Sequence, residues 1–321
     1  WCYRKDHELL SKSIKVMNGM VMRSTGSFYD VLGDDGVKYN CRMRGKIRLE
    51  EIKETNPVAV GDRVTIELEE DFGSITEILP RTNHILRQSV KKAAHAHVLA
   101  ANVDQVLLIA TIKQPRTSLG FIDRFLVAAE SFRIPQVLII NKKDLLSEKD
   151  LATANDLIRL YESIQVKTFL ISAALDEDVN FLRSLIQNKL TLIAGHSGVG
   201  KSTLLNKLSP EIEQTTGEIS GFSDKGTHTT TFAEMFQLDK ATFIIDTPGI
   251  KEWGLVKMEQ QEISDYFPEM RELRSECKFA SSCLHINEPK CAIKDAVENG
   301  TITLSRYESY LSMVMGDDNR K

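Results

Sequence analysis

Long apolar runs are absent from the 321-residue sequence, and none approaches the roughly 20 residues that a membrane-spanning helix needs. Residues 1–7 also lack the apolar core of a secretory signal peptide. We therefore expect a cytoplasmic protein that does not contact a membrane. An excess of positive charge is missing too, because 41 Lys and Arg residues face 45 Asp and Glu residues and the formal net charge is −4. This balance argues against a globally basic nucleic-acid binder but leaves room for a local basic stripe.

Cysteine is scarce and unevenly distributed. Three of the five cysteines, Cys277, Cys283 and Cys291, fall in one short window together with His285. In a cytoplasmic protein such a cluster fits metal ligation better than disulfide bonding. Three thiolates and one imidazole suffice for a closed tetrahedral Zn²⁺ site, and the lack of an open position predicts a structural ion on which this region depends to fold. The alternative is four unrelated buried residues.

The length predicts two or three domains, and 42% hydrophobic with 27% charged residues is ordinary for globular domains. Residues 13–80 read as short strands separated by turn signals, which favours a small β-barrel of the OB-fold type. Basic residues occupy every second position of one predicted strand and so share a face: Arg42, Arg44, Lys46 and Arg48. This row could track a phosphate backbone or be a solvated face balanced by nearby glutamates.

From residue 103 onward, apolar strands alternate with segments of helical spacing. Strands are predicted at 106–110, 137–140, 168–171 and 190–194, and helices at 121–132, 151–164, 181–186 and 202–208. This alternation predicts a parallel sheet covered on both faces, with ligands at the carboxyl ends of its strands. The preceding segment, 82–101, reads as a basic connector whose histidines, His84, His95 and His97, are surface or packing residues.

Residues 195–202 match the phosphate-loop pattern G-x-x-x-x-G-K-[ST] between a predicted strand and a predicted helix. Glycine at 195 and 200 lets the backbone turn its amide N–H groups inward, and the helix directs its positive end at the same anion. Lys201 would reach the β- and γ-phosphates, and the Ser202 hydroxyl would ligate Mg²⁺. The predicted contacts are Gly195, His196, Ser197, Gly198, Val199, Gly200, Lys201, Ser202 and Thr203.

A second motif, N-K-x-D, directly follows the strand at 137–140. Asp144 can accept hydrogen bonds from the N1–H and the exocyclic amine of guanine, a donor pair that adenine lacks. Asn141 and the stem of Lys142 would hold the loop and the plane of the base. Ser172 and Ala173, at the end of the next strand, could offer a backbone N–H to the guanine oxygen.

The remaining nucleotide contacts are expected after the phosphate loop. Residues 215–227, glycine-rich and without apolar periodicity, predict a mobile loop that ends in His228 and the threonines 229–231. Either Thr229 or Thr230 could complete Mg²⁺ coordination. Asp246 suits an outer-shell Mg²⁺ contact, and the Gly249 N–H can meet the γ-phosphate. Ile250 stands where many GTPases have a water-orienting Gln, so we assign that task to His228 as a hypothesis.

The order of these motifs is unusual. N-K-x-D precedes the phosphate loop, whereas the reverse order holds in Ras-like GTPases, so the domain is circularly permuted. With the barrel and the Cys-x5-Cys-x-His-x5-Cys finger, nearly the whole chain resembles the RsgA (YjeQ) family of circularly permuted, ribosome small-subunit-dependent GTPases. The resemblance implies an OB-fold that touches ribosomal RNA, stimulation of GTP hydrolysis by the small subunit, and a role in late maturation of that subunit. It also implies a catalytic His228 and a zinc ion held by Cys277, Cys283, His285 and Cys291.

We therefore expect an N-terminal OB-fold barrel in residues 1–82, an α/β circularly permuted P-loop GTPase domain in 83–262, and a helical zinc-binding domain in 263–321. The first dozen residues remain unassigned. The expected activity is hydrolysis of GTP to GDP by a monomer that needs Mg²⁺ and one zinc ion per chain, with Lys201 as a catalytic residue. Two alternatives are an RNA-binding scaffold in which GTP controls docking and hydrolysis is incidental, and an ATPase, against which Asp144 argues.

Overall fold

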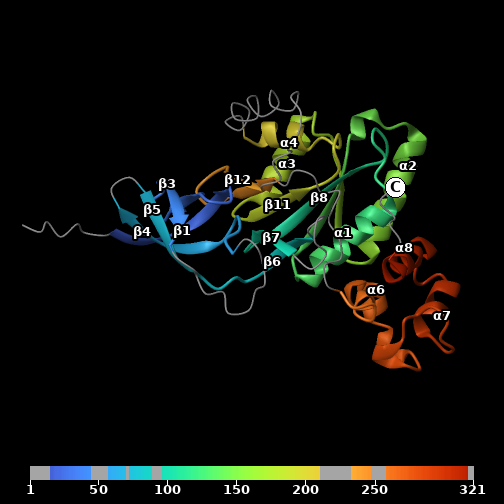
Figure 1. Cartoon of the computed structure of the whole chain (residues 1–321). Coiled ribbons are helices and arrows are strands. Elements are labelled where there is room, and N and C mark those ends of the chain that lie inside the picture. Colours follow the sequence, from blue (N-terminus) through green and yellow to red (C-terminus); the bar gives the residue numbers. More distant parts are fainter. Residues whose placement is uncertain are drawn as a thin grey trace, which may run out of the picture.

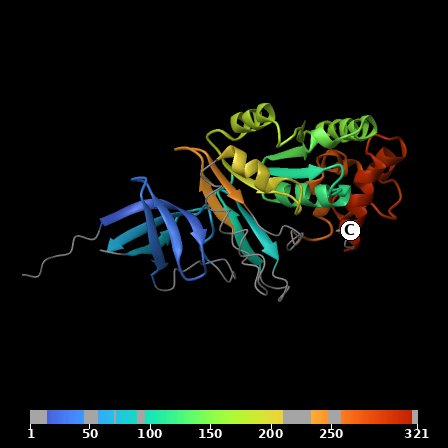
Figure 2. The same ribbon diagram turned by 90° about the horizontal axis from the view of Figure 1, so that it is seen from above.

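The computed structural model describes residues 15–44, 57–69, 72–88, 96–209, 233–246 and 258–316. A β-barrel lies at one end of the molecule, an α/β part in the middle, and a region of short helices at the other end (Figures 1 and 2). No helix in these ranges is long and apolar enough to cross a membrane.

The barrel closes on itself. Its strands follow the order β1-β2-β3-β5-β4, and β4 pairs again with β1. The β3–β5 pairing is parallel, and the others are antiparallel. Alternate side chains such as Val21, Val31 and Ile66 point inward to form its core, as period-2 strands require. The predicted OB-like barrel is confirmed, with strands β1 (Lys15–Ser24), β2 (Tyr29–Gly33), β3 (Lys38–Met43), β4 (Arg63–Glu69) and β5 (Phe72–Ile78).

The α/β part has the sheet order β10-β9-β8-β11-β13-β12, with β12 antiparallel to its neighbour and the others parallel. A single link, from Arg23 of β1 to Glu234 of β12, continues this sheet into the barrel. The strands are β8 (Gln105–Thr111), β9 (Gln136–Asn141), β10 (Lys167–Leu170), β11 (Leu190–Ala194), β12 (Glu234–Gln237) and β13 (Phe243–Asp246). The phosphate-loop strand β11 follows β9 in the sequence, as the permuted order predicts.

Helices cover both faces of this sheet. Val106 and Leu108 of β8 pack toward one pair of helices, whereas Leu107 and Ile109 pack toward the other pair, because successive strand residues face opposite sides. The first pair is α1 (Leu119–Ser131) and α2 (Glu148–Ser163), and the second is α3 (Asp176–Ile186) and α4 (Lys201–Leu208). Side-chain caps start the first two helices, since Ser118 accepts from the amide of Phe121 and Ser147 forms a capping box with Asp150.

The connector predicted at 82–101 forms a hairpin of β6 (His84–Gln88) and β7 (Ala96–Ala101). The His84 ring lies 5.2 Å from that of Phe132 at the end of α1, which agrees with a packing role. His95 and the side chain of His97 lie outside the described part of the chain.

A buried ion pair joins the barrel to this hairpin region. Asp62 is fully buried and accepts two hydrogen bonds from Arg81, of 2.7 and 2.8 Å, and a third of 2.7 Å from the amide of Ala59. Arg81 also donates to the carbonyl of Pro57 at 2.9 Å. Next to the pair, the Gly61 backbone passes so close to the Ala101 carbonyl that a Cβ at Gly61 would lie 2.1 Å from that oxygen.

Arg81→Met should therefore destabilise the protein by about 3–5 kcal/mol, because it leaves the Asp62 carboxylate buried without its cation. Urea unfolding followed by circular dichroism would measure the change. The matched control is Arg63→Met, which breaks the exposed 3.7 Å ion pair with Asp34 on the same barrel and should change stability little. Equal losses of stability in the two variants would show that the buried Asp62–Arg81 pair contributes no more than an exposed ion pair.

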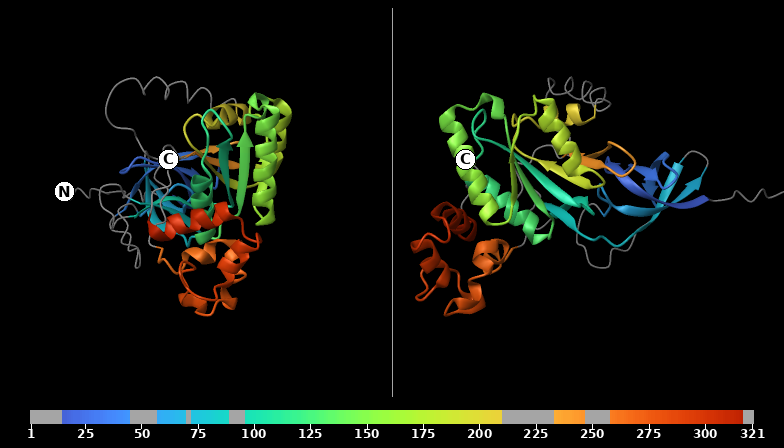
Figure 3. Two further views of the ribbon diagram at one scale, coloured as in Figure 1. Left: turned by 90° about the vertical axis from the view of Figure 1, so that its right-hand side faces the viewer. Right: turned by 180° about the vertical axis from the view of Figure 1, so that it is seen from behind.

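The C-terminal region consists of short helices packed beside α1, away from the barrel (Figure 3). Its core includes Phe267, Tyr310 and the clustered cysteines, and Val127 of α1 joins it. The helical spacing at 263–273 does not correspond to one continuous helix. The chain there forms a one-turn helix that begins at Pro268, with a 3-10 turn before it and another after it. The elements are η3 (Ile263–Tyr266), α6 (Pro268–Arg271), η4 (Arg274–Glu276), η5 (Ala280–Ser282), α7 (Ala292–Glu298) and α8 (Leu304–Met315).

Candidate nucleotide site and metal centre

The phosphate loop runs from β11 to α4 over the carboxyl ends of the neighbouring strands. Gly195 and Gly200 have φ values of 150° and 100°, which disfavour residues with a Cβ. Space is lacking as well, because a Cβ at Gly195 would lie 2.4 Å from the Ile109 carbonyl oxygen and one at Gly200 would lie 2.4 Å from the Asn141 Nδ2. Both glycines of the motif are thus required by conformation and by close approach.

Asn141, at the end of β9, ties three loops together. Its Nδ2 donates to the Val199 carbonyl at 2.8 Å, and its Oδ1 accepts from the Ala173 amide at 2.8 Å. The side chain is 1% exposed, so both hydrogen bonds are shielded from water. The N-K-x-D motif, the phosphate loop and the turn after β10 therefore meet at one edge of the sheet.

The aspartate predicted to read guanine is held by the same turn. Ser172 Oγ donates to Asp144 Oδ1 at 2.5 Å, and the carboxylate is on the surface. The Ser172 amide donates to Asp178 at 2.7 Å, whereas the Ala173 amide donates to Asn141. Both predicted backbone donors to the guanine oxygen thus have protein acceptors, and one of these would have to yield to a base.

Residues 113–121 follow β8 and touch both loops, although sequence reasoning did not assign them to the site. The Lys142 ammonium donates to the Gln114 carbonyl, and a Cβ built at Gly198 would lie 3.4 Å from Pro115. The Phe121 ring lies against that of His196 in the phosphate loop, with centroids 3.7 Å apart. The available signal was their position at the carboxyl end of a buried strand, where parallel sheets bind ligands.

Lys201 occupies the centre of the phosphate loop. Its ammonium donates to the carbonyls of Gly195 at 2.6 Å and His196 at 2.8 Å. Burial lowers the pKa of Lys201, and the Asp246 carboxylate opposes this change by favouring the charged form. Asp246 ends β13, in register with Ile193 of β11, and Ser202 and Thr203 lie exposed in the first turn of α4. Lys201, Ser202 and Asp246, three of the groups predicted to contact phosphate and Mg²⁺, thus lie around one loop.

Some predicted residues lie outside the described ranges: the loop 215–227, His228, Thr229, Thr230 and Gly249, and the basic residues Lys46 and Arg48. The other two basic residues can be placed. Arg42 and Arg44 are exposed at the end of β3, while Cys41 between Asn40 and Arg42 is buried. The Arg42 guanidinium lies 4.4 Å from the ring centre of Phe28 and 5.6 Å from that of Phe72, and Arg44 pairs with Glu67.

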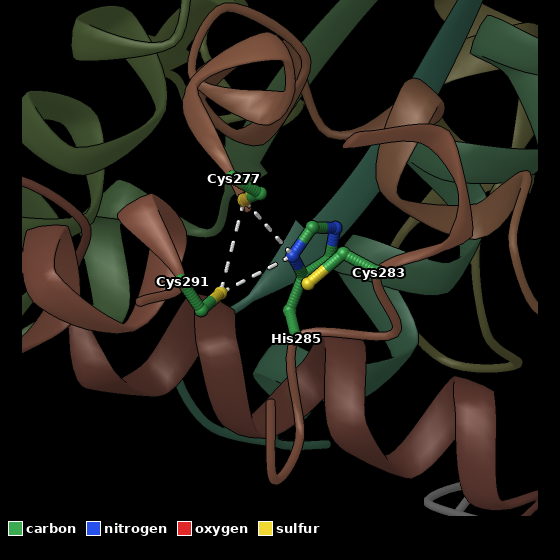
Figure 4. A group of neighbouring side chains, drawn as sticks. All are labelled: Cys277, Cys283, His285 and Cys291. Carbon is green, nitrogen blue, oxygen red and sulfur yellow. Dashed lines mark hydrogen bonds between the residues drawn. The ribbon is translucent and has the colours of Figure 1, made fainter. Parts of the chain in front are cut away.

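The three cysteines and His285 converge on one point (Figure 4). Their possible ligand atoms all lie within 4.8 Å of one another. Cys277 Sγ is 3.9 Å from Cys291 Sγ and 3.6 Å from His285 Nδ1, which is 3.4 Å from Cys291 Sγ. A tetrahedral ion with metal–sulfur bonds of about 2.3 Å places two sulfur ligands about 3.8 Å apart, and a sulfur and a nitrogen about 3.6 Å apart. The group therefore matches a four-coordinate metal site.

The chemical state of these groups also suits a cation. Burial lowers the pKa of His285 to about 4, so its imidazole is neutral and can be a ligand at neutral pH. Burial raises the pKa of the Cys291 thiol to about 12, and a bound cation would stabilise the thiolate instead. The loop is held from behind, because Tyr307 donates to the His285 carbonyl at 2.6 Å and Glu288 accepts from the Leu284 and Ile286 amides, both at 2.8 Å.

Comparison with known proteins connects these features. The profile of the RsgA GTPase family matches residues 78–256, and that of the RsgA N-terminal domain matches residues 18–75. A protein of Christiangramia forsetii named "Small ribosomal subunit biogenesis GTPase RsgA" is 48% identical over 306 residues, covering 94% of this chain and 97% of that protein. A Bacteroides fragilis protein of the same name is 48% identical over 299 residues, covering 93% and 96%.

Two solved structures share the architecture. YjeQ from Thermotoga maritima has a TM-score of 0.76 and 33% identity, covering 96% of this chain and all of that one. YloQ, titled a circularly permuted GTPase, has a TM-score of 0.72 and 30% identity, covering 99% of both chains. With matching sequence, fold and motif order along almost its whole length, the chain belongs to the RsgA GTPase family and is a GTP-hydrolysing enzyme.

Proposed function

We propose that this enzyme hydrolyses GTP with Mg²⁺ in late maturation of the small ribosomal subunit, and that the subunit stimulates turnover. Two kinds of support carry the proposal. The relatives at 48% identity are named for biogenesis of that subunit. Within the molecule, the decisive observation is the 2.8 Å hydrogen bond from Asn141 to the Val199 carbonyl, which joins the base loop to the phosphate loop, since one nucleotide can then bridge both.

The proposed division of labour follows from position. Asp144 would read the base, and Lys201 would turn from the Gly195 and His196 carbonyls to the β- and γ-phosphates. Ser202 would ligate Mg²⁺, with Asp246 in its outer shell. In this scheme catalysis rests on charge neutralisation and positioning. The roles of His228, Thr229, Thr230 and Gly249 stay proposals about residues outside the described ranges.

The Cys277, Cys283, His285 and Cys291 group would hold one structural Zn²⁺. Zinc fits the donor set because it prefers thiolate and imidazole in tetrahedral geometry. Four protein ligands leave no position for a reacting water, so this ion would stabilise the C-terminal region rather than act on GTP.

We further propose that the barrel contacts ribosomal RNA through Arg42, Arg44, Lys46 and Arg48, that the C-terminal region makes a second contact, and that the protein is a cytoplasmic monomer. The division at 82/83 and 262/263 is part of the same proposal. The barrel and the C-terminal region lie on opposite sides of the GTPase part (Figure 1), so RNA bound at both would span the nucleotide site.

A GTPase assay with and without purified small ribosomal subunits, across a salt series, tests this proposal. Four phosphate contacts should weaken binding by about 100-fold between 50 and 200 mM salt, and stimulation should fade accordingly. Arg42→Gln should reduce the slope of log affinity against log salt concentration by about 1, the share of one phosphate contact, and leave unstimulated turnover unchanged. Turnover that subunits do not raise at low salt would instead indicate a scaffold in which hydrolysis is incidental.

A further inference from the structure

Helix α1 contacts the nucleotide site with its first turn. The Phe121 ring is 5% exposed and lies 3.7 Å, between ring centres, from His196, the second residue of the phosphate loop. The segment just before the helix touches Lys142 through the Gln114 carbonyl. Any rotation or shift of α1 must therefore move groups in direct contact with the loops that hold base and phosphates.

The next turn of the same helix contacts the C-terminal region. Asp123, which is 1% exposed, accepts hydrogen bonds from Arg306 of α8 at 2.7 Å and from the Tyr161 hydroxyl of α2 at 2.9 Å. Arg306 is 2% exposed and also donates to Glu269 of α6 at 2.7 and 3.2 Å. Its guanidinium lies 4.4 Å from the ring centre of Phe267.

The hydrogen bonds that Arg306 makes to Asp123 and Glu269 depend on direction, whereas apolar packing does not. Burial alone would lower the pKa of Arg306, but the two carboxylates outweigh it and raise that pKa above its ordinary value. The Arg306 guanidinium reaches both carboxylates and the Phe267 ring in one orientation only. A displaced α1 would therefore leave charges buried and unpaired. The interface therefore favours one placement of α1 against α6 and α8.

We propose that Arg306 is a positioning residue of the nucleotide site. It acts through Asp123 to fix α1, and through Phe121 to fix His196 and the phosphate loop. The placement of the C-terminal region and the affinity for guanine nucleotide are then coupled, and by thermodynamic reciprocity bound nucleotide tightens the same interface. The inference rests on the proposed binding of guanine nucleotide at this loop.

The test is the dissociation rate of a fluorescent GDP derivative from the full-length protein, chased with unlabelled GDP. Arg306→Met and Phe121→Leu should each speed dissociation by about 5- to 50-fold, a typical range for coupled sites. Because both act on one path, the double variant should be no faster than the faster single variant. Arg306→Lys, which keeps the charge but loses the fork, should fall between wild type and Arg306→Met.

Arg271→Gln is the matched control, since it breaks the exposed 2.8 Å ion pair to Glu130 between the same helix and the same region. It should leave the rate within about twofold of wild type. An unchanged rate in Arg306→Met, or single effects that multiply in the double variant, would overturn the inference. If wild type itself fails to retain GDP against ATP, the proposed function fails and not merely this coupling.

Hydrogen exchange of the wild-type protein covers the case in which Arg306→Met does not fold. GDP should slow exchange of the backbone amides of α8, because nucleotide and interface stabilise each other. Equal exchange of α8 with and without GDP, in a protein shown to bind GDP, would reject the coupling.

Discussion

Cys291→Ser is expected to abolish metal binding and to unfold the C-terminal region while the rest of the chain stays folded. Structural zinc in small domains contributes an apparent binding free energy of about 10–16 kcal/mol, which exceeds what the short helices of this region can supply by packing. All four possible ligands are at most 4% exposed, and the three cysteines belong to the hydrophobic core of the region. Without the ion, that core would contain thiols and an imidazole in place of apolar side chains.

Metal content by mass spectrometry and limited proteolysis of the full chain would measure both effects. Cys41→Ser is the matched control, because Cys41 is equally buried, in the barrel core, and is not part of the cluster. The control should retain one metal ion and resist cleavage in the C-terminal region. A Cys291→Ser protein with a full complement of zinc and a protease-resistant C-terminal region would show that the group is not a metal site.

Local signals explain why most of the fold could be predicted from the sequence. The strands β8, β9 and β11 are short apolar runs bounded by turn residues, and each is buried along nearly its whole length. The phosphate loop could be predicted because only glycine fits at residues 195 and 200, so the sequence pattern is specific. The helical spacing at 263–273 was misleading about length, since Pro268 lacks an N–H and can only begin a helix.

Other features depend on contacts that no local pattern encodes. Arg306 and Asp123 are 183 residues apart, and each is an ordinary charged residue within an amphipathic helix until folding buries them together. The sequence of the β6–β7 hairpin indicates only a connector, because the segment is basic and contains three histidines, and its pairing depends on the barrel and α1 beside it. The motif alone places Asn141 in the base loop, but its hydrogen bond to Val199, 58 residues away, can be found only in the structure.

In the proposed scheme base selectivity depends most directly on Asp144, and Asp144→Asn should lower the apparent affinity for GTP by about 100-fold or more. The carboxylate would accept from two guanine donors, and each hydrogen bond to a charged group is worth about 1.5–3 kcal/mol. With Ser172 holding one side of residue 144, an amide there would point a donor at the guanine donors, whereas xanthine offers a carbonyl at the same place. The variant should therefore prefer XTP to GTP, measured by hydrolysis at subsaturating nucleotide.

Asp178→Asn separates this effect from damage to the loop. Asp178 accepts from the Ser172 amide at 2.7 Å and pairs with Lys143 at 3.3 Å. It is therefore a second carboxylate that supports the same turn, and it is not the one assigned to the base. If Asp144 reads the base directly, Asp178→Asn can weaken both nucleotides but must leave their ratio in favour of GTP. A ratio that stays unchanged in Asp144→Asn, or that reverses in Asp178→Asn, would place the guanine contact elsewhere at this edge of the sheet.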